Sequence, residues 1–249
     1  MSKILIIGGG AMGSAFSIPC LENNNLVTIT EPYNKIFIKN LASKKKFHSS
    51  LKLNLPKKLK FENYSKNIFK RRYDLIVIAL SLAGIDFIGK ELKDLRIKTP
   101  LLVLTKGLKY DKKKKKLLTI SNLLKHNYNV GNVSVLKGPC LAKELAKKNK
   151  TSVVMANKNI KIVKWIGKLI STKYYFTEFS RDVVGIEICS AIKNIYAMVI
   201  GIGQNLNAES DLFQKSVNEM KFLIKHFKGD TSTILGLAGI GDLYVSAIG

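Results

Sequence analysis

Short apolar runs alternate with longer segments of helical periodicity through most of the chain. The apolar runs predict strands at Ile4–Ile7, Leu26–Thr30, Leu75–Leu80, Leu101–Leu104, Val133–Leu136 and Ser152–Ala156. The other segments predict the start of a helix at Ser14–Leu21 and helices at Ile36–Lys45, Ala83–Leu95, Lys116–Leu124, Leu141–Lys148 and Ile160–Ser171. A repeating strand–helix unit indicates an α/β fold, in which helices cover both faces of a doubly wound parallel sheet.

The alternation ends after Tyr174–Thr177. Val183–Gly203 predicts one long, largely buried helix and Glu209–Phe227 predicts a second, with no strand evident between or after them. We therefore expect a domain boundary near Arg181. An α/β domain would occupy residues 1–180, and an incomplete all-helical domain would occupy residues 181–249.

A glycine-rich string, Gly8–Gly13, directly follows the first predicted strand and opens the first predicted helix. Gly8 permits a tight turn, Gly10 lets the backbone approach a pyrophosphate, and Gly13 lets the helix pack closely on the strand. The free N–H groups at the helix start, around Ala11 and Met12, would then face the phosphates. This context predicts a dinucleotide-binding domain of the Rossmann type over residues 1–180.

An acidic residue, Glu31, ends the second predicted strand, 18 residues after Gly13. A carboxylate at this point accepts hydrogen bonds from the adenosine ribose hydroxyls and repels a 2′-phosphate, which slightly favours NAD over NADP. The alternative is a plain surface acid at the end of a strand. Lys35 and Lys39 lie nearby and could offset the charge of the acid and admit NADP, so the cofactor prediction is NAD or NADP.

The formal net charge of +25 raises the question of a nucleic-acid or anionic membrane partner. Only four of the 42 basic residues are arginine, however, whereas phosphate and base-edge recognition tends to use the arginine fork. The run Lys112–Lys116 indicates a solvated turn and helix start, or else a specific anion-binding patch. We expect no specific nucleic-acid partner, although a positive field would attract anionic substrates and cofactors.

The cysteines and the hydropathy give the expected compartment. The chain has an odd number of cysteines and no CxxC motif or Cys/His cluster, which supports neither a disulfide framework nor a metal site: Cys20, Cys140 and Cys189. The longest apolar candidate, Ile186–Leu206, is interrupted by Lys193 and three amides, and Gly8–Gly10 breaks the apolar segment that a signal peptide would need. We expect a cytoplasmic protein with no membrane partner, and His48, His126 and His226 on its surface.

Four further strings occur in order at predicted strand ends and helices: Thr105–Leu108, Gly138–Glu144, Gly185–Asn194 and Gly236–Leu243. Together with the glycine-rich string, they resemble the NAD(P)-dependent glycerol-3-phosphate dehydrogenases of the soluble bacterial type, over essentially the whole chain. The resemblance implies hydride transfer between NAD(P)H and dihydroxyacetone phosphate, a small phosphorylated substrate, to give sn-glycerol 3-phosphate for glycerophospholipid synthesis.

By this resemblance Lys193 is the catalytic general acid/base, whose ammonium protonates the developing alkoxide during reduction. The sequence supports Lys193 independently. A lysine between Ile192 and Ile195 in an apolar helix is costly to bury and often has a depressed pKa, although it could instead extend from a helix edge to solvent. Asn194 resembles the substrate-contacting amide of the family, with a plain surface asparagine as the alternative.

The other strings supply the remaining site residues that the resemblance implies. Lys106 lies near both substrate and nicotinamide, Gly138 belongs to a substrate-binding loop, and Ala142 contacts the cofactor. Cys140 stands where the family has serine or threonine, and a thiol donates a weaker hydrogen bond than a hydroxyl. Asp242 orients Lys193 or binds a substrate hydroxyl, unless it is only a turn or helix-capping aspartate.

Two features depart from the family. Asn205–Ser216 lacks the usual glycine- and arginine-containing segment, and the chain stops at Gly249, before the Ser-Arg-Asn motif and several further helices. That arginine is a bidentate phosphate clamp, and its loss should weaken substrate binding by roughly 2 to 5 kcal/mol. We therefore expect a truncated form in which cofactor binding survives better than catalysis. An apolar face of Val183–Gly203 would be left partly uncovered, which favours poor stability, aggregation or a homodimer.

Three alternatives remain at this stage. A 3-hydroxyacid dehydrogenase or a ketopantoate reductase also sets a helix-borne lysine against a Rossmann domain, but Gly236–Leu243 argues against both. A non-catalytic dinucleotide-binding protein would explain a missing phosphate clamp. A basic nucleic-acid binder would explain the charge alone.

Overall fold

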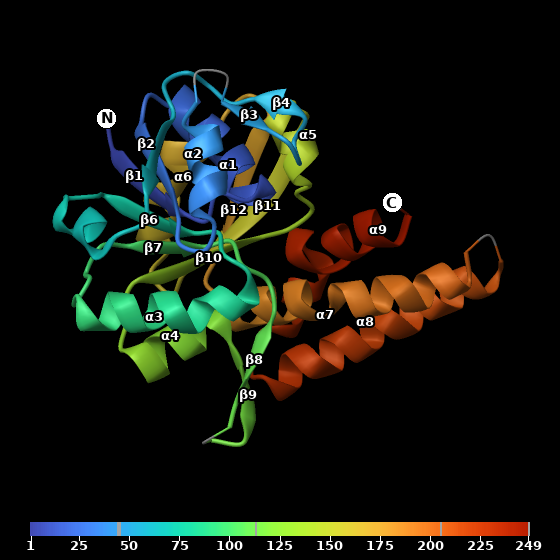
Figure 1. The fold of residues 1–249 in the computed structure, drawn as a ribbon. Helices are drawn as coiled ribbons and strands as arrows, with labels where there is room; N and C mark the ends of the chain where they lie inside the picture. The colour runs from blue at the N-terminus through green and yellow to red at the C-terminus, as the bar shows by residue number, and fades with distance from the viewer. Residues whose placement is uncertain (44–45, 113, 205, 249) are drawn as a thin grey trace.

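The computed structural model describes residues 1–43, 46–112, 114–204 and 206–248. Its main sheet contains eight strands: β1 (Lys3–Ile7), β2 (Leu26–Glu31), β5 (Lys60–Asn63), β6 (Leu75–Ile78), β7 (Leu101–Val103), β10 (Val133–Lys137), β11 (Thr151–Ala156) and β12 (Tyr175–Ser180). Their spatial order is β12-β11-β10-β7-β6-β1-β2-β5 (Figure 1). All neighbouring strands are parallel except β10 and β11.

Helices cover both faces of this sheet, as the sequence predicted. Successive side chains of a strand point to opposite faces, so Ile4 and Ile6 of β1 enter one core while Leu5 and Ile7 enter the other. The first core is closed by α1 (Ala11–Glu22), α2 (Lys35–Leu41), α5 (Ala142–Ala146) and α6 (Ile160–Ile170). The second is closed by α3 (Ile85–Asp94), α4 (Ile120–Tyr128) and α7 (Val183–Ile202). The doubly wound α/β class is therefore confirmed.

The prediction of a helix from Lys116 was wrong. Lys116–Thr119 is strand β9, which pairs antiparallel with β8 (Leu108–Asp111). The helix α4 begins only at Ile120, where the Thr119 hydroxyl accepts the N–H of Asn122 and so caps the helix. Lys116–Thr119 is extended because its backbone pairs with Leu108–Asp111 across the hairpin.

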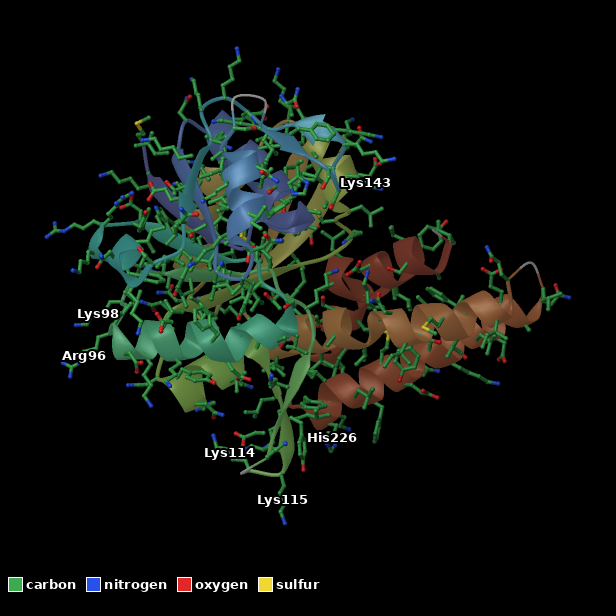
Figure 2. All side chains as sticks on the ribbon, in the orientation of Figure 1. Arg96, Lys98, Lys114, Lys115, Lys143 and His226 are labelled. Atoms are coloured by element: carbon green, nitrogen blue, oxygen red, sulfur yellow. The ribbon has the colours of Figure 1, made fainter. Side chains whose placement is uncertain are left out.

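The basic run Lys112–Lys116 consequently lies at a hairpin turn and the start of β9, not at a helix start, and Lys113 in this run falls outside the described residues. Figure 2 shows Lys114 and Lys115 at the tip of this hairpin, far from Arg96, Lys98 and Lys143, which lie on other sides of the molecule. These labelled cations do not gather on one face.

Other differences concern short or edge elements. The predicted helix Ile36–Lys45 ends at Leu41, and Lys44 and Lys45 lie outside the described residues. The small sheet of β3 (Phe47–His48) and β4 (Leu53–Asn54) and the edge strand β5 were not predicted, since none contains an apolar run. Period-two alternation carries no information on strand direction, and so could not predict that β11 runs antiparallel to β10.

The C-terminal third is helical, as predicted: after α7 come α8 (Ala208–His226), the short turns η3 (Thr231–Leu235) and η4 (Leu237–Gly241), and α9 (Asp242–Ile248). Figure 1 shows α7 and α8 side by side, extending away from the sheet, with α9 lying along α7. The segment Asn205–Ser216 contains the beginning of α8, while Asn205 and the terminal Gly249 lie outside the described residues.

Helix α7 is both a core helix and an exposed apolar surface. Among the described residues it alone has the length and composition of a membrane-crossing helix, and 56% of its apolar window is buried inside this fold. Toward its C-terminal end Ile195, Met198 and Ile202 are 63%, 75% and 80% exposed. An uncovered apolar face on this helix was predicted, and a homodimer through it stays a prediction.

Candidate active site

The glycine-rich turn connects β1 to α1. Gly8 has φ +116°, and a Cβ placed there would lie 2.4 Å from the carbonyl oxygen of Ala79 at the end of β6. A Cβ on Gly13 would lie 2.1 Å from the carbonyl oxygen of Gly8. Both glycines are therefore required by the fold itself, one for its left-handed backbone and the other for close packing.

Gly10 differs from Gly8 and Gly13. Its φ is −61°, and a Cβ built on it would meet nothing within 4 Å. It stands at the N-cap of α1, and no side chain caps that helix end. Open space over an uncapped helix N-terminus fits the pyrophosphate of a dinucleotide, which would receive the backbone N–H groups there.

Glu31 is tied to this turn. One carboxylate oxygen accepts the N–H of Gly9 at 2.9 Å and the other accepts the N–H of Tyr33 at 3.0 Å. A carboxylate oxygen can accept more than one hydrogen bond, so a ribose hydroxyl could still bind. Lys35 and Lys39 are exposed on α2, and neither forms a contact that joins it to Glu31 among the described interactions.

The prediction of three surface histidines was wrong for His48. Its side chain is fully buried, its Nε2 lies 3.2 Å from the carbonyl oxygen of Gly9, and its ring meets Phe37 edge-on. The β3–β4 hairpin contacts α2 and brings His48 against the backbone of Gly9, a long-range contact with no sequence signal. His126 and His226 are exposed, and Figure 2 shows His226 at the C-terminal end of α8, on the side of the β8–β9 hairpin.

Two lysines converge on one buried carboxylate. The Lys193 ammonium, on α7, contacts the carboxylate of Asp242 and donates to the Ser246 hydroxyl at 2.6 Å. The Lys106 ammonium, from the loop after β7, lies 2.9 Å from the second oxygen of the same carboxylate. The side chain of Asp242 is 2% exposed, that of Lys193 10% and that of Lys106 36%. Three segments far apart in sequence thus form one charged cluster.

Burial has a chemical consequence for Lys193. Removal from water lowers the pKa of its ammonium, the neighbouring positive charge of Lys106 adds to this effect, and Asp242 opposes it. Lys193 is therefore a better proton donor than a solvated lysine and stays oriented by its two bonds. This is the property expected of a general acid.

The cluster and the glycine turn lie at the same edge of the sheet. Strands β1, β6 and β7 are adjacent and parallel, so their carboxyl ends meet there. Gly8 packs against Ala79, and the hydroxyl of Thr105, next to Lys106, donates to the carbonyl of Leu80 at 2.7 Å. Ligands of open α/β sheets bind in the crevice at this edge.

The loop after β10 also faces this region. Gly138 has φ +119°, and a Cβ there would lie 3.7 Å from the Cβ of Leu237, so the loop packs on the segment that leads to Asp242. Burial raises the pKa of the Cys140 thiol to about 11, against the opposing effect of the Lys106 charge. Cys140 is thus protonated at neutral pH and is a poor nucleophile.

The remaining predicted residues lie less centrally. Ala142 begins α5 and is half-buried. Asn194 is exposed on α7, and none of the contacts of the described residues joins it to Lys193 or Asp242. Their predicted roles stay predictions.

Sequence reasoning missed three residues of the cluster. Lys137, the last residue of β10, is 2% exposed and donates to the carbonyl of Thr105 at 2.6 Å. Glu187 on α7 is buried and accepts the N–H of Ser121, and Ser246 binds Lys193. Lys193 was singled out because it is a charged residue in an apolar segment. The same criterion, applied to the other strands and helices, would have identified Lys137 and Glu187.

Comparisons with known proteins bear on this geometry. A family model described as the N-terminus of NAD-dependent glycerol-3-phosphate dehydrogenase matches residues 3–163, and the corresponding C-terminus model matches residues 182–249. A glycerol-3-phosphate dehydrogenase [NAD(P)+] of Clostridium botulinum is 29% identical over 99% of this chain and 74% of its own length. An NADP(+)-dependent glycerol-3-phosphate dehydrogenase of Archaeoglobus fulgidus is also 29% identical, over 96% of this chain and 74% of its own length.

The fold agrees with a solved structure as well. The crystal structure of glycerol-3-phosphate dehydrogenase from Coxiella burnetii superposes with a TM-score of 0.86 at 24% identity. The match covers 99% of this chain and 75% of that one.

Proposed function

Because this chain belongs to the NAD-dependent glycerol-3-phosphate dehydrogenase family, we propose that it reduces dihydroxyacetone phosphate with NAD(P)H to sn-glycerol 3-phosphate. The product is a precursor of glycerophospholipids. The observation that carries the proposal is the buried cluster of Lys193, Asp242 and Lys106 at the sheet edge that also holds the glycine turn. When bound, the nicotinamide supplies the hydride for the carbonyl carbon.

Lys193 is the proposed proton donor. An ammonium has three N–H donors, of which one is directed to Asp242 and one to Ser246; no hydrogen bond within the described part of the chain takes the third, which could donate to the substrate oxygen at C2. Reduction of the carbonyl would place negative charge on this oxygen, and the proton of Lys193 would neutralise it. Asp242 holds the ammonium in place, and in the reverse reaction the neutral amine accepts the hydroxyl proton.

Lys106 is proposed to attract and hold the substrate phosphate. Two ammonium groups face one carboxylate at the cluster, so one positive charge is left in excess. Lys106 is also the more exposed of the two lysines, and a charge at a partly dry surface attracts anions more strongly than one in bulk water. We assign Gly138, Cys140 and Asn194 to the substrate side of the same crevice.

The cofactor is proposed to lie along Gly8–Gly13, with its pyrophosphate over Gly10, Ala11 and Met12 and with Ala142 and Lys106 nearer the nicotinamide. Glu31 would bind the adenosine ribose and so favour NAD, because a 2′-phosphate would meet its carboxylate. Support for this preference is that Glu31 already lies against the turn through the N–H of Gly9. The relatives include enzymes of both NAD(P)+ and NADP+ dependence.

The division into residues 1–180 for the cofactor and 181–249 for the substrate is part of this proposal, since Lys193 and Asp242 come from the second part. We place the protein in the cytoplasm, in agreement with three unpaired cysteines. The exposed Ile195, Met198 and Ile202 support a homodimer through α7.

The decisive experiment measures oxidation of NADH and of NADPH by the purified protein with dihydroxyacetone phosphate, together with identification of the product. We expect glycerol 3-phosphate to form and Lys193→Met to lower kcat by about 100- to 10,000-fold, the usual contribution of a general acid. Lys221→Met, on the exposed side of α8, is the matched control and should behave as the parent.

Cofactor binding is measured separately by titration. Tight NADH binding without any turnover would reject the reductase proposal and leave a non-catalytic dinucleotide-binding protein. Turnover that survives intact in Lys193→Met would reject the assignment of the proton donor.

A further inference from the structure

Lys137 is a buried cation that the proposed mechanism does not use. It is the last residue of β10, directly before Gly138, and its side chain lies on the face of the sheet covered by α7. A buried ammonium without partners costs several kcal/mol, so its surroundings must compensate for lost hydration. Its partners therefore indicate what the side chain does.

The main partner of Lys137 is the loop that carries Lys106. Its Nζ donates to the carbonyl oxygen of Thr105 at 2.6 Å, and the carbonyl oxygens of Leu104 and Val103 lie at 3.3 and 3.4 Å. These three carbonyls belong to the carboxyl end of β7. The ammonium thus connects the carboxyl ends of the neighbouring strands β10 and β7. Each of these strands continues there into a loop that we propose contacts the substrate.

Thr105 is held from two sides as a result. Its hydroxyl donates to the carbonyl of Leu80 at the end of β6, and its own carbonyl accepts from Lys137. The next residue is Lys106, whose ammonium reaches Asp242, and Gly107 then turns the chain with φ +126°. The direction in which Lys106 leaves the sheet therefore depends on the plane of the Thr105 peptide.

The charges around Lys137 belong to the active-site cluster. Burial lowers the pKa of its ammonium to about 7; the positive charge of Lys106 adds to this effect, and the carboxylates of Glu187 and Asp242 oppose it. These are the ionisable groups that face Lys137 from the β7 loop, α7 and α9. Lys137 thus interacts electrostatically with both residues of the Lys106–Asp242 ion pair.

We propose that Lys137 is a positioning residue for the reductase reaction, which binds the Thr105 carbonyl and thereby aims Lys106 at Asp242 and the substrate. This inference rests on the proposed function for its kinetic part only. The effect on the loop is a property of the protein without substrate, and it can be measured whether or not the protein reduces dihydroxyacetone phosphate.

The test replaces Lys137 by methionine, which has a similar length and no donor, and measures two quantities. Amide hydrogen exchange of Thr105–Leu108 should become about tenfold faster or more, while exchange in β6 is unchanged. With dihydroxyacetone phosphate, kcat should fall by about 10- to 100-fold, because a displacement of about 1 Å can cost that much. The Kd for NADH should change less than kcat, because the glycine turn that binds the pyrophosphate is not altered.

The pH profile separates positioning from a merely structural role. Because burial lowers the pKa of Lys137 to about 7, the profile of kcat should lose a transition near neutral pH in Lys137→Met, while the limb caused by Lys193 remains. Lys143→Met is the matched control, because Lys143 is an exposed lysine that extends outward from α5 in the same loop region (Figure 2). It should match the parent in exchange, kcat and pH profile.

A second variant keeps the proposal testable if Lys137→Met does not fold. Lys137→Gln retains an N–H donor but loses the charge and some reach, so loop protection and kcat should both fall below those of the parent. Parental exchange of Thr105–Leu108 in the folded variant would overturn the proposal. If exchange is faster in the variant but the parent itself does not reduce dihydroxyacetone phosphate, the proposed function is rejected. The positioning of the loop by Lys137 is then retained.

Discussion

Gly10→Ala should separate cofactor binding from folding. At Gly10 φ is −61° and ψ is 179°, which alanine adopts without strain, and the added Cβ meets no protein atom within 4 Å. Loss of glycine freedom in the unfolded chain stabilises the fold by about 0.4–1 kcal/mol. Alanine is a poorer N-cap than glycine, which offsets part of this gain. We therefore expect the free energy of unfolding to stay within about 1 kcal/mol of the parent.

The same methyl group would occupy the space proposed for the pyrophosphate. Forcing an extra methyl into a filled contact costs roughly 1–3 kcal/mol, and each 1.4 kcal/mol is a factor of about ten in affinity. The Kd for NADH should thus rise by about 5- to 150-fold. Calorimetric titration with NADH measures the affinity, and urea denaturation without cofactor measures the stability.

Gly13→Ala is the matched control with the opposite pattern. Its Cβ would lie 2.1 Å from the carbonyl oxygen of Gly8, so the strand and α1 must separate. We expect a loss of about 1–3 kcal/mol of stability or more before any cofactor is added. If Gly10→Ala binds NADH like the parent, the placement of the pyrophosphate over Gly10 is refuted.

Three further predictions concern the charged cluster and the neighbouring loop that carries Cys140. Because burial lowers the pKa of Lys193 below 10.5 and reduction needs the protonated form, kcat for reduction should fall as pH rises through that lowered pKa; a plateau extending past pH 10.5 contradicts this. Asp242→Asn leaves two ammonium groups facing each other, so urea denaturation should show a loss of about 3–5 kcal/mol. Cys140→Ser supplies a stronger donor and should lower KM for dihydroxyacetone phosphate several-fold, worth about 1 kcal/mol, with the Kd for NADH unchanged.

Local features explain why much of the site could be predicted. The turn at Gly8–Gly13 is formed by neighbouring residues of one strand and one helix. The spacing of its glycines was therefore enough to predict it. Lys193 is a charged residue within an apolar helix. Such a residue can be recognised from the sequence alone. The central strands were predicted for the same reason, since their apolar runs are continuous.

Contacts between distant segments explain what could not be predicted. His48 lies in a polar stretch, and it is buried only because the hairpin that carries it packs against the glycine turn. Lys116–Thr119 has a helical neighbour, and only its pairing with Leu108–Asp111 makes it a strand. Lys137 directly follows the predicted strand Val133–Leu136 and was not singled out, because the carbonyls that bind it lie more than 30 residues earlier in the chain.

The sequence by itself determined the strand–helix alternation, the glycine turn and the identity of the lysine in the apolar helix, because backbone preference and hydrophobic period act within a few residues. Only the tertiary structure decided that Lys193 and Lys106 meet at the Asp242 carboxylate and that Lys137 binds the loop beside them. Parallel strands end at the same edge, and α7 and α9 fold back over it, so their charges meet in a place with little water. The electrostatics that lower the pKa of Lys193 arise from this assembly, since no lysine has such a pKa in an extended chain.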